Sequence, residues 1–218
     1  MSNYVKKFPK RYIDVGIAEG HAVTYASGVA TSGFKPIIPF YSTFLQRAYD
    51  NIFHDVLLQN LPVVFCMDRA GVVGPDGPTH HGVYDISLLR SLPNLIITAP
   101  KDGDELKNLI ATGLKLEKKS MAIRYPKDTA YKYDESIEAK ILKIGTWETL
   151  HSGRKTAILA TGSMVGIVNE NYDEITNQLG FKPELINARF IKPMDFDLLD
   201  EIEKKFDLII TMEEGALN

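Results

Sequence analysis

Apolar positions along the chain fall into two patterns, short continuous runs and longer segments with helical spacing. The short runs predict strands at residues 12–15, 36–40, 63–67, 95–98 and 121–125. The segments between them predict helices at residues 17–32, 42–60, 85–91 and 103–115, with Ser42 as the N-cap of the second. Strands that are apolar throughout are buried on both faces, which is typical of a parallel sheet. The alternation therefore predicts an α/β fold with a doubly wound parallel sheet.

A second, smaller α/β unit is expected after a polar stretch at residues 126–140, which has no clean periodicity. Its strands are predicted at 156–160, 185–188 and 208–212, and its helices at 164–178 and 195–206. We place a first domain at 1–128, a linker at 129–140 and a second domain at 141–218. Both domains are expected to be incomplete, because the first strand lies close to the start of the chain and three strands make a thin second unit.

Composition narrows the class of protein. The 218 residues are 44% hydrophobic with a formal net charge of −3, which excludes a disordered chain and gives no sign of a basic nucleic-acid-binding face. The one cysteine excludes an intramolecular disulfide or a cysteine-cluster metal site, and its apolar neighbours predict that Cys66 is buried and inert. No run approaches the length of a membrane helix, and the basic N-terminus lacks the apolar core of a signal peptide. We therefore expect a cytoplasmic protein.

Glu19 stands at the start of a helix rich in small residues. Two interpretations stay open: a charge that counters the helix dipole, or a partly buried carboxyl that holds or exchanges a proton. Tyr41 and Phe44, followed by Arg47, raise a similar choice. They are either core aromatics on a helix face or, at the carboxyl end of a strand, rings that stack on a planar ligand.

The loop at residues 68–82 follows a buried strand and is rich in glycine, which favours a site loop over a solvated connector. Arg69, Asp76 and His80 supply charge and proton-transfer groups there. The adjacent pair His80-His81 is a poor metal signal, because neighbouring side chains rarely point together. Arg124, at the end of an apolar strand, suits recognition of a phosphate by paired hydrogen bonds, with a surface salt bridge as the alternative.

Four stretches, in order, carry a specific resemblance: DVGIAEGHAVT, YSTFLQRAYDNIFHDV, DRAGVVGPDGPTHHGVYDIS and RYP. They resemble the 1-deoxy-D-xylulose-5-phosphate synthase family of transketolase-like thiamine diphosphate enzymes. RFIKPMDFDLL with TMEEG is similar to that family's C-terminal domain. The resemblance covers the chain from about Phe8 onward. It implies a homodimeric transferase that condenses pyruvate with glyceraldehyde 3-phosphate and releases carbon dioxide. This is the first step of non-mevalonate isoprenoid synthesis, and the product also feeds thiamine and pyridoxal phosphate synthesis.

The resemblance also implies roles for single residues. Glu19 matches a catalytic glutamate that hydrogen-bonds the aminopyrimidine ring of thiamine diphosphate. Tyr41 and Phe44 match residues that pack around this ring, with Arg47 close by. Asp76 and His80 match groups that face the substrate together with Tyr41, and His80 transfers protons. Arg69 and Arg124 match arginines that hold the phosphate of the aldehyde substrate.

Two departures from the family qualify the resemblance. Gly20 stands where many relatives carry glutamine, which leaves Glu19 in place but loosens the expected helix start. The family's diphosphate- and Mg²⁺-binding domain, with its GDG…N signature, would precede this chain, and Asp102-Gly103-Asp104 has the wrong order. We therefore expect a fragment that holds half of the cofactor site and is inactive alone. Transketolase, the β subunit of 2-oxo acid dehydrogenases and a non-catalytic interaction module are the alternatives.

Overall fold

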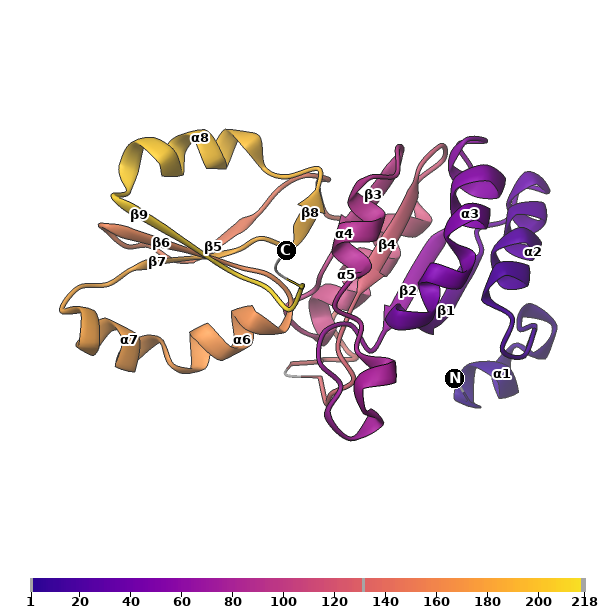
Figure 1. Cartoon of the computed structure of the whole chain (residues 1–218), viewed down its shortest axis with the longest axis horizontal. Helices are drawn as coiled ribbons and strands as arrows, with labels where there is room; N and C mark the ends of the chain where they lie inside the picture. The colour runs from indigo at the N-terminus through magenta and orange to yellow at the C-terminus, as the bar shows by residue number, and fades with distance from the viewer. Residues whose placement is uncertain (1, 131, 217–218) are drawn as a thin grey trace.

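The computed structural model describes residues 2–130 and 132–216. They form two α/β units, each built around one sheet, with the strand orders β1-β2-β4-β3-β8 and β5-β7-β6-β9 (Figure 1). Both sheets are mostly parallel, and each has one antiparallel strand at its edge. The predicted α/β class is confirmed, with these two edge strands added.

The first sheet follows the predicted apolar runs. Its parallel strands are β1 (Ile37–Tyr41), β2 (Val64–Asp68), β3 (Leu95–Thr98) and β4 (Ser120–Arg124). All residues of β3 and β4 are buried, as expected for strands covered on both faces. The fifth strand, β8 (Phe190–Lys192), comes from late in the chain and pairs antiparallel with β3. The second unit is thus tied into the sheet of the first.

Two apolar layers cover the first sheet. On one side, α2 (Glu19–Thr31), the helical segment after β1 and α4 (Asp85–Arg90) pack against Phe65, Met67 and Ile97. On the other side, α5 (Gly103–Leu114) packs through Leu109 against Val64 and Met121. Asp102 caps α5 by accepting a hydrogen bond from the backbone N–H of Glu105 at 2.7 Å. A short helix, α1 (Ser2–Lys7), precedes this unit.

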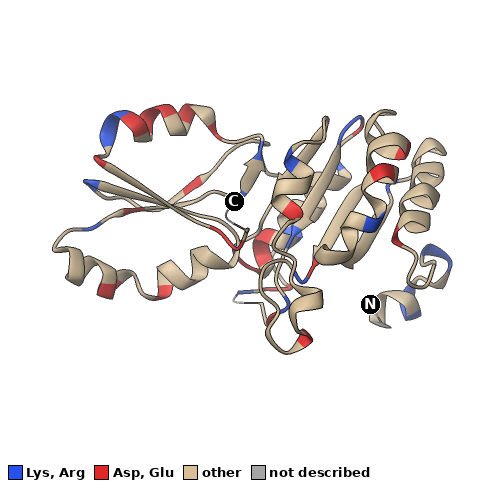
Figure 2. Cartoon of the chain, in the orientation of Figure 1, with Lys and Arg blue, Asp and Glu red and all other residues tan. Residues whose placement is uncertain are grey.

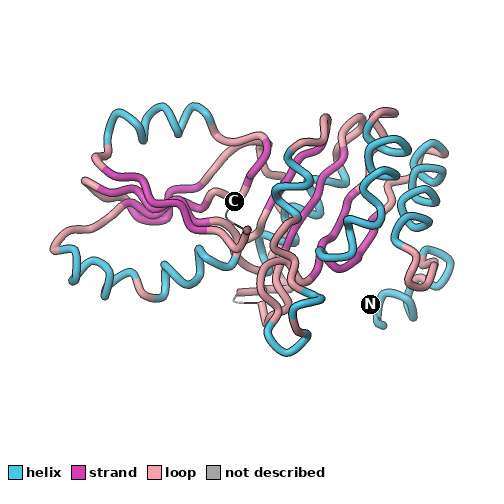
Figure 3. Tube along the Cα trace, in the orientation of Figure 1, coloured by secondary structure: helices cyan, strands magenta, loops and turns pink. Residues whose placement is uncertain are grey.

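The second sheet contains β5 (Glu148–His151), β6 (Thr156–Ala160), β7 (Glu184–Asn187) and β9 (Leu208–Met212). α6 (Ser163–Glu170) and α7 (Tyr172–Leu179) cover one face, and α8 (Phe196–Lys205) covers the other (Figure 3). Charged residues line α8, with lysines at its C-terminal end, where they complement the helix dipole (Figure 2). Within the described residues, no helix has the length and apolar character needed to cross a membrane.

Several predicted elements were wrong. Residues 12–15 form no strand: no neighbouring strand pairs with them, and Ile13, like Ile17 just beyond, is largely exposed, at 56% and 87% respectively. The helix predicted at 164–178 breaks at Asn171, whose amide donates to the carbonyl of Ile167 at 2.8 Å and competes with the helix backbone. The strands β5 and β8 were missed, since each is short and lacks a clear apolar pattern. With β5, the second sheet has four strands rather than three, whereas β8 joins the first sheet.

The helix predicted at 42–60 is irregular. A 3₁₀ segment (Ser42–Ala48), a single turn α3 (Tyr49–Asn51) and a π-helical segment (Ile52–Leu57) follow one another. The apolar spacing was read correctly, because Leu45, Ile52 and Leu57 are buried. Ser42 is not a helix cap: its hydroxyl donates instead to the carboxylate of Asp85 at 2.9 Å.

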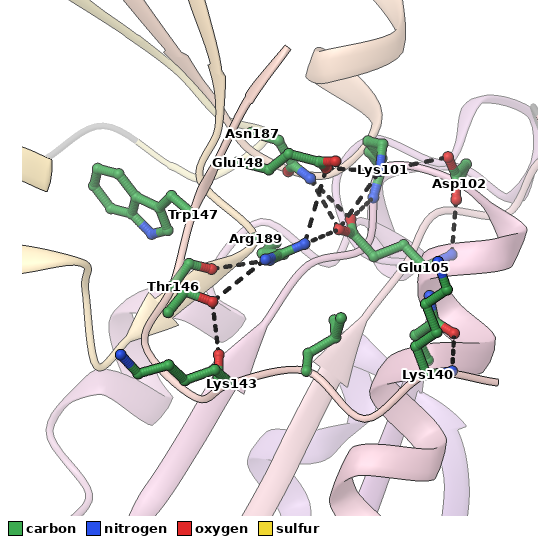
Figure 4. A network of polar contacts seen from close by, with 12 residues as sticks. Lys101, Asp102, Glu105, Lys140, Lys143, Thr146, Trp147, Glu148, Asn187 and Arg189 are labelled. Carbon is green, nitrogen blue, oxygen red and sulfur yellow. Dashed lines mark hydrogen bonds and ion pairs between the residues drawn. The ribbon is translucent and has the colours of Figure 1, made fainter.

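A polar network with a buried centre joins the two units (Figure 4). At its centre, the carboxylate of Glu105 on α5 accepts from the amide of Asn187 at 2.9 Å and from Arg189 at 3.3 Å. Lys101 extends the network to Glu148 on β5 at 3.1 Å. Because Glu105 is only 3% exposed, this contact fixes the second unit against α5 through desolvated charges.

Candidate active site

The candidate residues gather where three parallel strands of the first sheet end. Tyr41 ends β1 opposite Asp68 at the end of β2, and Arg124 ends β4 opposite Met67. Ligands of open α/β sheets bind outside the carboxyl ends of the strands. The sheet topology therefore brings together segments that are far apart in the sequence.

Glu19 is the first residue of α2, and its side chain is 10% exposed. The guanidinium of Arg47 lies beside it, with Nη1 at 3.2 Å from one carboxylate oxygen and 3.4 Å from the other. Ala18 at the N-cap offers no side-chain hydrogen bond to the helix. The carboxylate is thus both a charge at a helix start and a largely buried ion-pair partner, which combines features of the two interpretations. Gly20 does not disturb this helix start, since α2 begins at Glu19.

Tyr41 and Phe44 form a half-buried stacked pair beside Glu19. Their ring centres are 5.7 Å apart with an angle of 20° between the planes. His80 approaches the edge of this pair, with its ring centre 5.4 Å from that of Phe44. Two arginines cover the rings, Arg47 at 4.3 Å from the centre of Phe44 and Arg69 at 3.8 Å from that of Tyr41. The aromatic residues therefore belong to a charged surface rather than to the apolar core.

Arg69 is held in place by two carboxylates. Its Nε donates to Asp76 and its Nη1 to Asp68, both at 2.8 Å. Its backbone has a φ of 61°, in the left-handed region that is costly for a residue with a side chain. Asp76 also accepts from Lys127, and these hydrogen bonds from Lys127 and Arg69 lower the pKa of the Asp76 carboxyl. The loop thus presents a fixed guanidinium next to the aromatic pair.

The two adjacent histidines have different surroundings. Nδ1 of His80 lies 2.9 Å from the hydroxyl of Thr79, while Nδ1 of His81 accepts from the backbone N–H of Val73 at 3.1 Å. His81 therefore stabilises the loop, and His80 stands beside the aromatic rings. Among the residues described, no group of three or more His, Cys, Asp or Glu side chains is placed to hold a metal ion.

Among the candidate residues, Arg124 differs most from its expected position. It is 2% exposed, and its Nε donates at 2.9 Å to the carboxylate of Asp85, which is itself 2% exposed. The salt bridge that we considered for the surface is therefore buried beneath the loop. Sequence reasoning missed Asp85, because an acid at the first position of a helix has an ordinary role there. It also missed Ser42 as a partner of Asp85 and Lys127 as a partner of Asp76.

Comparison with family models gives two matches. The model described as "Transketolase, pyrimidine binding domain" matches residues 2–132, and "Transketolase, C-terminal domain" matches residues 145–218. Among solved structures, a "Split gene transketolase, inactive beta4 tetramer" superposes with a TM-score of 0.86 at 24% identity. That match covers 99% of this chain and 69% of the other, and at this identity it shows the fold alone.

Sequence identity to curated relatives is about twice the identity to this solved structure. The chain is 49% identical over 215 residues to 1-deoxy-D-xylulose-5-phosphate synthase of Gloeothece citriformis, and 50% identical over 213 residues to that of Thermosynechococcus vestitus. For the synthase of Aquifex aeolicus the identity is 48% over 214 residues. These alignments cover 97–98% of this chain but only 33–34% of the relatives. The chain thus spans about a third of the length of the relatives that it matches.

Proposed function

Because the chain belongs to the transketolase family, with a pyrimidine-binding domain followed by a C-terminal domain, we propose that it is part of a 1-deoxy-D-xylulose-5-phosphate synthase. The assembled enzyme would condense pyruvate with glyceraldehyde 3-phosphate and release carbon dioxide. One observation carries this proposal: Glu19, the Tyr41–Phe44 pair and the fixed guanidinium of Arg69 meet at one edge of the sheet. The identity of 48–50% to synthases over nearly the whole chain supports the choice of reaction.

The residues fit the pyrimidine half of thiamine diphosphate. Tyr41 and Phe44 are an aromatic pair of the kind that packs around a planar ring, and the carboxylate of Glu19 lies close by with Arg47, which also covers Phe44, as its charged partner. Glu19 would hold the proton that is exchanged at a nitrogen of this ring. When bound, the cofactor would supply an acidic ring carbon whose deprotonated form is a nucleophile toward a 2-oxo acid.

The remaining candidates would act on the substrates. Arg69 would bind the phosphate of glyceraldehyde 3-phosphate, because a guanidinium fixed by two carboxylates is already oriented for paired hydrogen bonds. Arg124, which is buried beneath the loop at residues 68–82, would also support phosphate binding. His80 would transfer a proton through Nε2, since Nδ1 faces Thr79. Tyr41 and Asp76 would line the substrate side of the site.

The rest of the proposal concerns assembly. We propose Mg²⁺ as a second cofactor, with ligands from a segment outside this chain, and a homodimeric, cytoplasmic enzyme. The proposed domains are residues 1–128 and 141–218, joined by a linker at 129–140. In support, the relatives are about three times as long as the part that this chain covers. The 218 residues alone are expected to be inactive.

A hybrid enzyme tests the reaction. In it, this chain replaces the matching third of the Aquifex aeolicus synthase, to which it is 48% identical. We expect the hybrid to form 1-deoxy-D-xylulose 5-phosphate from pyruvate and glyceraldehyde 3-phosphate. Transfer of a two-carbon unit from a ketose phosphate would instead indicate a transketolase. A hybrid that binds thiamine diphosphate but acts on neither pair of substrates would favour a non-catalytic interaction module.

A further inference from the structure

A buried carboxylate, Asp85, connects three segments of the candidate site. It is the first residue of α4, and its side chain is fully shielded from solvent. One oxygen, Oδ2, accepts from Nε of Arg124 and from the hydroxyl of Ser42, both at 2.9 Å. The other oxygen, Oδ1, accepts from the backbone N–H of Ile86 at 2.8 Å. The carboxylate therefore bonds to two other segments, through Ser42 and Arg124, and to the backbone of its own helix.

The two side-chain partners of Asp85, Ser42 and Arg124, tie it to the candidate functional residues. Ser42 follows Tyr41 directly in the chain. It also lies against Gly82, where an added Cβ atom would come within 2.5 Å of the Ser42 hydroxyl, so the end of the loop at 68–82 closes onto it. Arg124 ends β4 beside β2, from which Arg69 emerges. A shift of Asp85 would therefore move the aromatic pair, the loop and Arg124 relative to one another.

The ion pair with Asp85 engages only one nitrogen of the Arg124 guanidinium. Within the described part of the chain, Nη2 of Arg124 is buried without a hydrogen-bond partner. Asp85 binds only Nε, so the guanidinium is held at one nitrogen and not by a two-pronged pair. Burying a donor without a partner in the protein is costly, and an anion that reached Nη2 would satisfy it.

We propose that Asp85 is a positioning residue of this site: it holds Ser42 and Arg124 in one arrangement and so directs the free Nη2 donor toward the phosphate of the aldehyde substrate. This inference rests on the proposed function for the identity of the phosphate. It goes beyond that function in assigning a role to a residue that touches neither substrate nor cofactor.

The first test uses the chain as it is and needs no substrate. Nitrogen-15 NMR of arginine side chains would report the Nε–H signal of Arg124, assigned by its loss in Arg124→Lys. In Asp85→Asn we expect this proton to exchange with water about tenfold faster or more, since one hydrogen bond of about 1.4 kcal/mol corresponds to a factor of ten. Glu105→Gln is the matched control, because it neutralises another buried acid bonded to an arginine. It should leave the Arg124 signal unchanged.

The second test uses the hybrid enzyme. Asp85→Asn should raise the KM for glyceraldehyde 3-phosphate about tenfold or more, with the KM for pyruvate nearly unchanged. Ser42→Ala, which keeps the ion pair, should raise the same KM by a few fold, and it preserves the test if Asp85→Asn fails to fold. Glu105→Gln should lower the melting temperature without changing either KM.

The outcomes separate the two proposals. If the unmodified hybrid makes no 1-deoxy-D-xylulose 5-phosphate, the proposed function fails, while the NMR comparison still reports on Asp85. If the hybrid is active but Asp85→Asn and Glu105→Gln change both KM values alike, Asp85 is merely structural. An Arg124 signal that is unchanged in Asp85→Asn would also overturn its positioning role.

Discussion

The guanidinium of Arg69 lies over the ring of Tyr41, 3.8 Å from the ring centre, while Asp68 and Asp76 hold its nitrogens. The stacking contact and the ion pairs fix the plane of the guanidinium, so that little freedom is lost when a phosphate binds. This relationship joins the end of β1 to the loop after β2 and connects the cofactor side of the proposed site to its substrate side.

Replacing Arg69 tests its role in phosphate binding. In the hybrid enzyme, Arg69→Ala should raise the KM for glyceraldehyde 3-phosphate about ten- to a hundredfold, because charge-assisted hydrogen bonds contribute about 1.5–3 kcal/mol. Arg69→Lys should rescue binding only partly, since an ammonium group lacks the planar fork. Steady-state kinetics with each substrate varied in turn checks this. Equal losses for pyruvate and the aldehyde would contradict phosphate binding by Arg69.

The lowered pKa of Asp76 predicts a specific response to pH. Hydrogen bonds from Lys127 and Arg69 favour the carboxylate, so the folded pKa lies below the unfolded value of about 3.9. The contribution of these ion pairs to stability is thus complete above the unfolded pKa and is lost as the pH falls through the folded one. Carbon-13 NMR of the Asp76 carboxyl should show the low pKa, and Lys127→Met should raise it. A pKa that is unchanged in Lys127→Met would mean that the Lys127 contact does not persist in solution.

The network between the two units should be important for stability. Glu105→Ala leaves Arg189 and Asn187 without their buried partner, which we expect to cost about 3–5 kcal/mol in the free energy of unfolding. Glu148, at 41% side-chain exposure, provides the comparison: Glu148→Ala should cost about 1 kcal/mol or less. Denaturant unfolding of both variants measures the difference. Equal costs would show that burial of Glu105 is not the deciding factor.

Cys66 should be unreactive in the folded chain. It is buried in β2, and burial raises the pKa of its thiol to about 12, so the reactive thiolate is scarce at neutral pH. A thiol-specific reagent at pH 8 should modify Cys66 only at the rate of unfolding and at once in denaturant. Fast modification of the native chain would show that β2 opens to solvent.

The first sheet was predictable because its strands are short, continuous apolar runs between segments of helical spacing. The 63–67 run became β2 (Val64–Asp68) and the 121–125 run became β4 (Ser120–Arg124), each within one residue. By contrast, β8 (Phe190–Lys192) has only three residues, and its place in the first sheet depends on pairing with the distant strand β3, where Ile97 lies opposite Lys192. Local patterns contain no information on such a contact.

The candidate site likewise combines residues that local patterns indicate with residues that only the folded chain brings together. Arg69, Asp76 and His80 could be proposed from the sequence, because charged and ionisable residues in a glycine-rich loop after a buried strand are unusual. Asp85 was missed, since its helix-start position gives it an ordinary explanation, and only the folded chain brings it within 2.9 Å of Arg124. The partners of a buried charge are set by tertiary packing, which no short motif reveals.

The most direct test of the proposed function compares two hybrids, one with this chain unchanged and one with Glu19→Gln. Glutamine keeps the size of the side chain and can still hydrogen-bond, but it cannot exchange a proton with the cofactor's ring. The measurement is formation of 1-deoxy-D-xylulose 5-phosphate from pyruvate and glyceraldehyde 3-phosphate, with cofactor binding followed separately by calorimetry. We expect product from the unchanged hybrid and a loss of turnover of about a hundredfold or more in Glu19→Gln, with the cofactor still bound. Equal turnover in both hybrids, or no product from a hybrid that binds the cofactor, would contradict the proposed function.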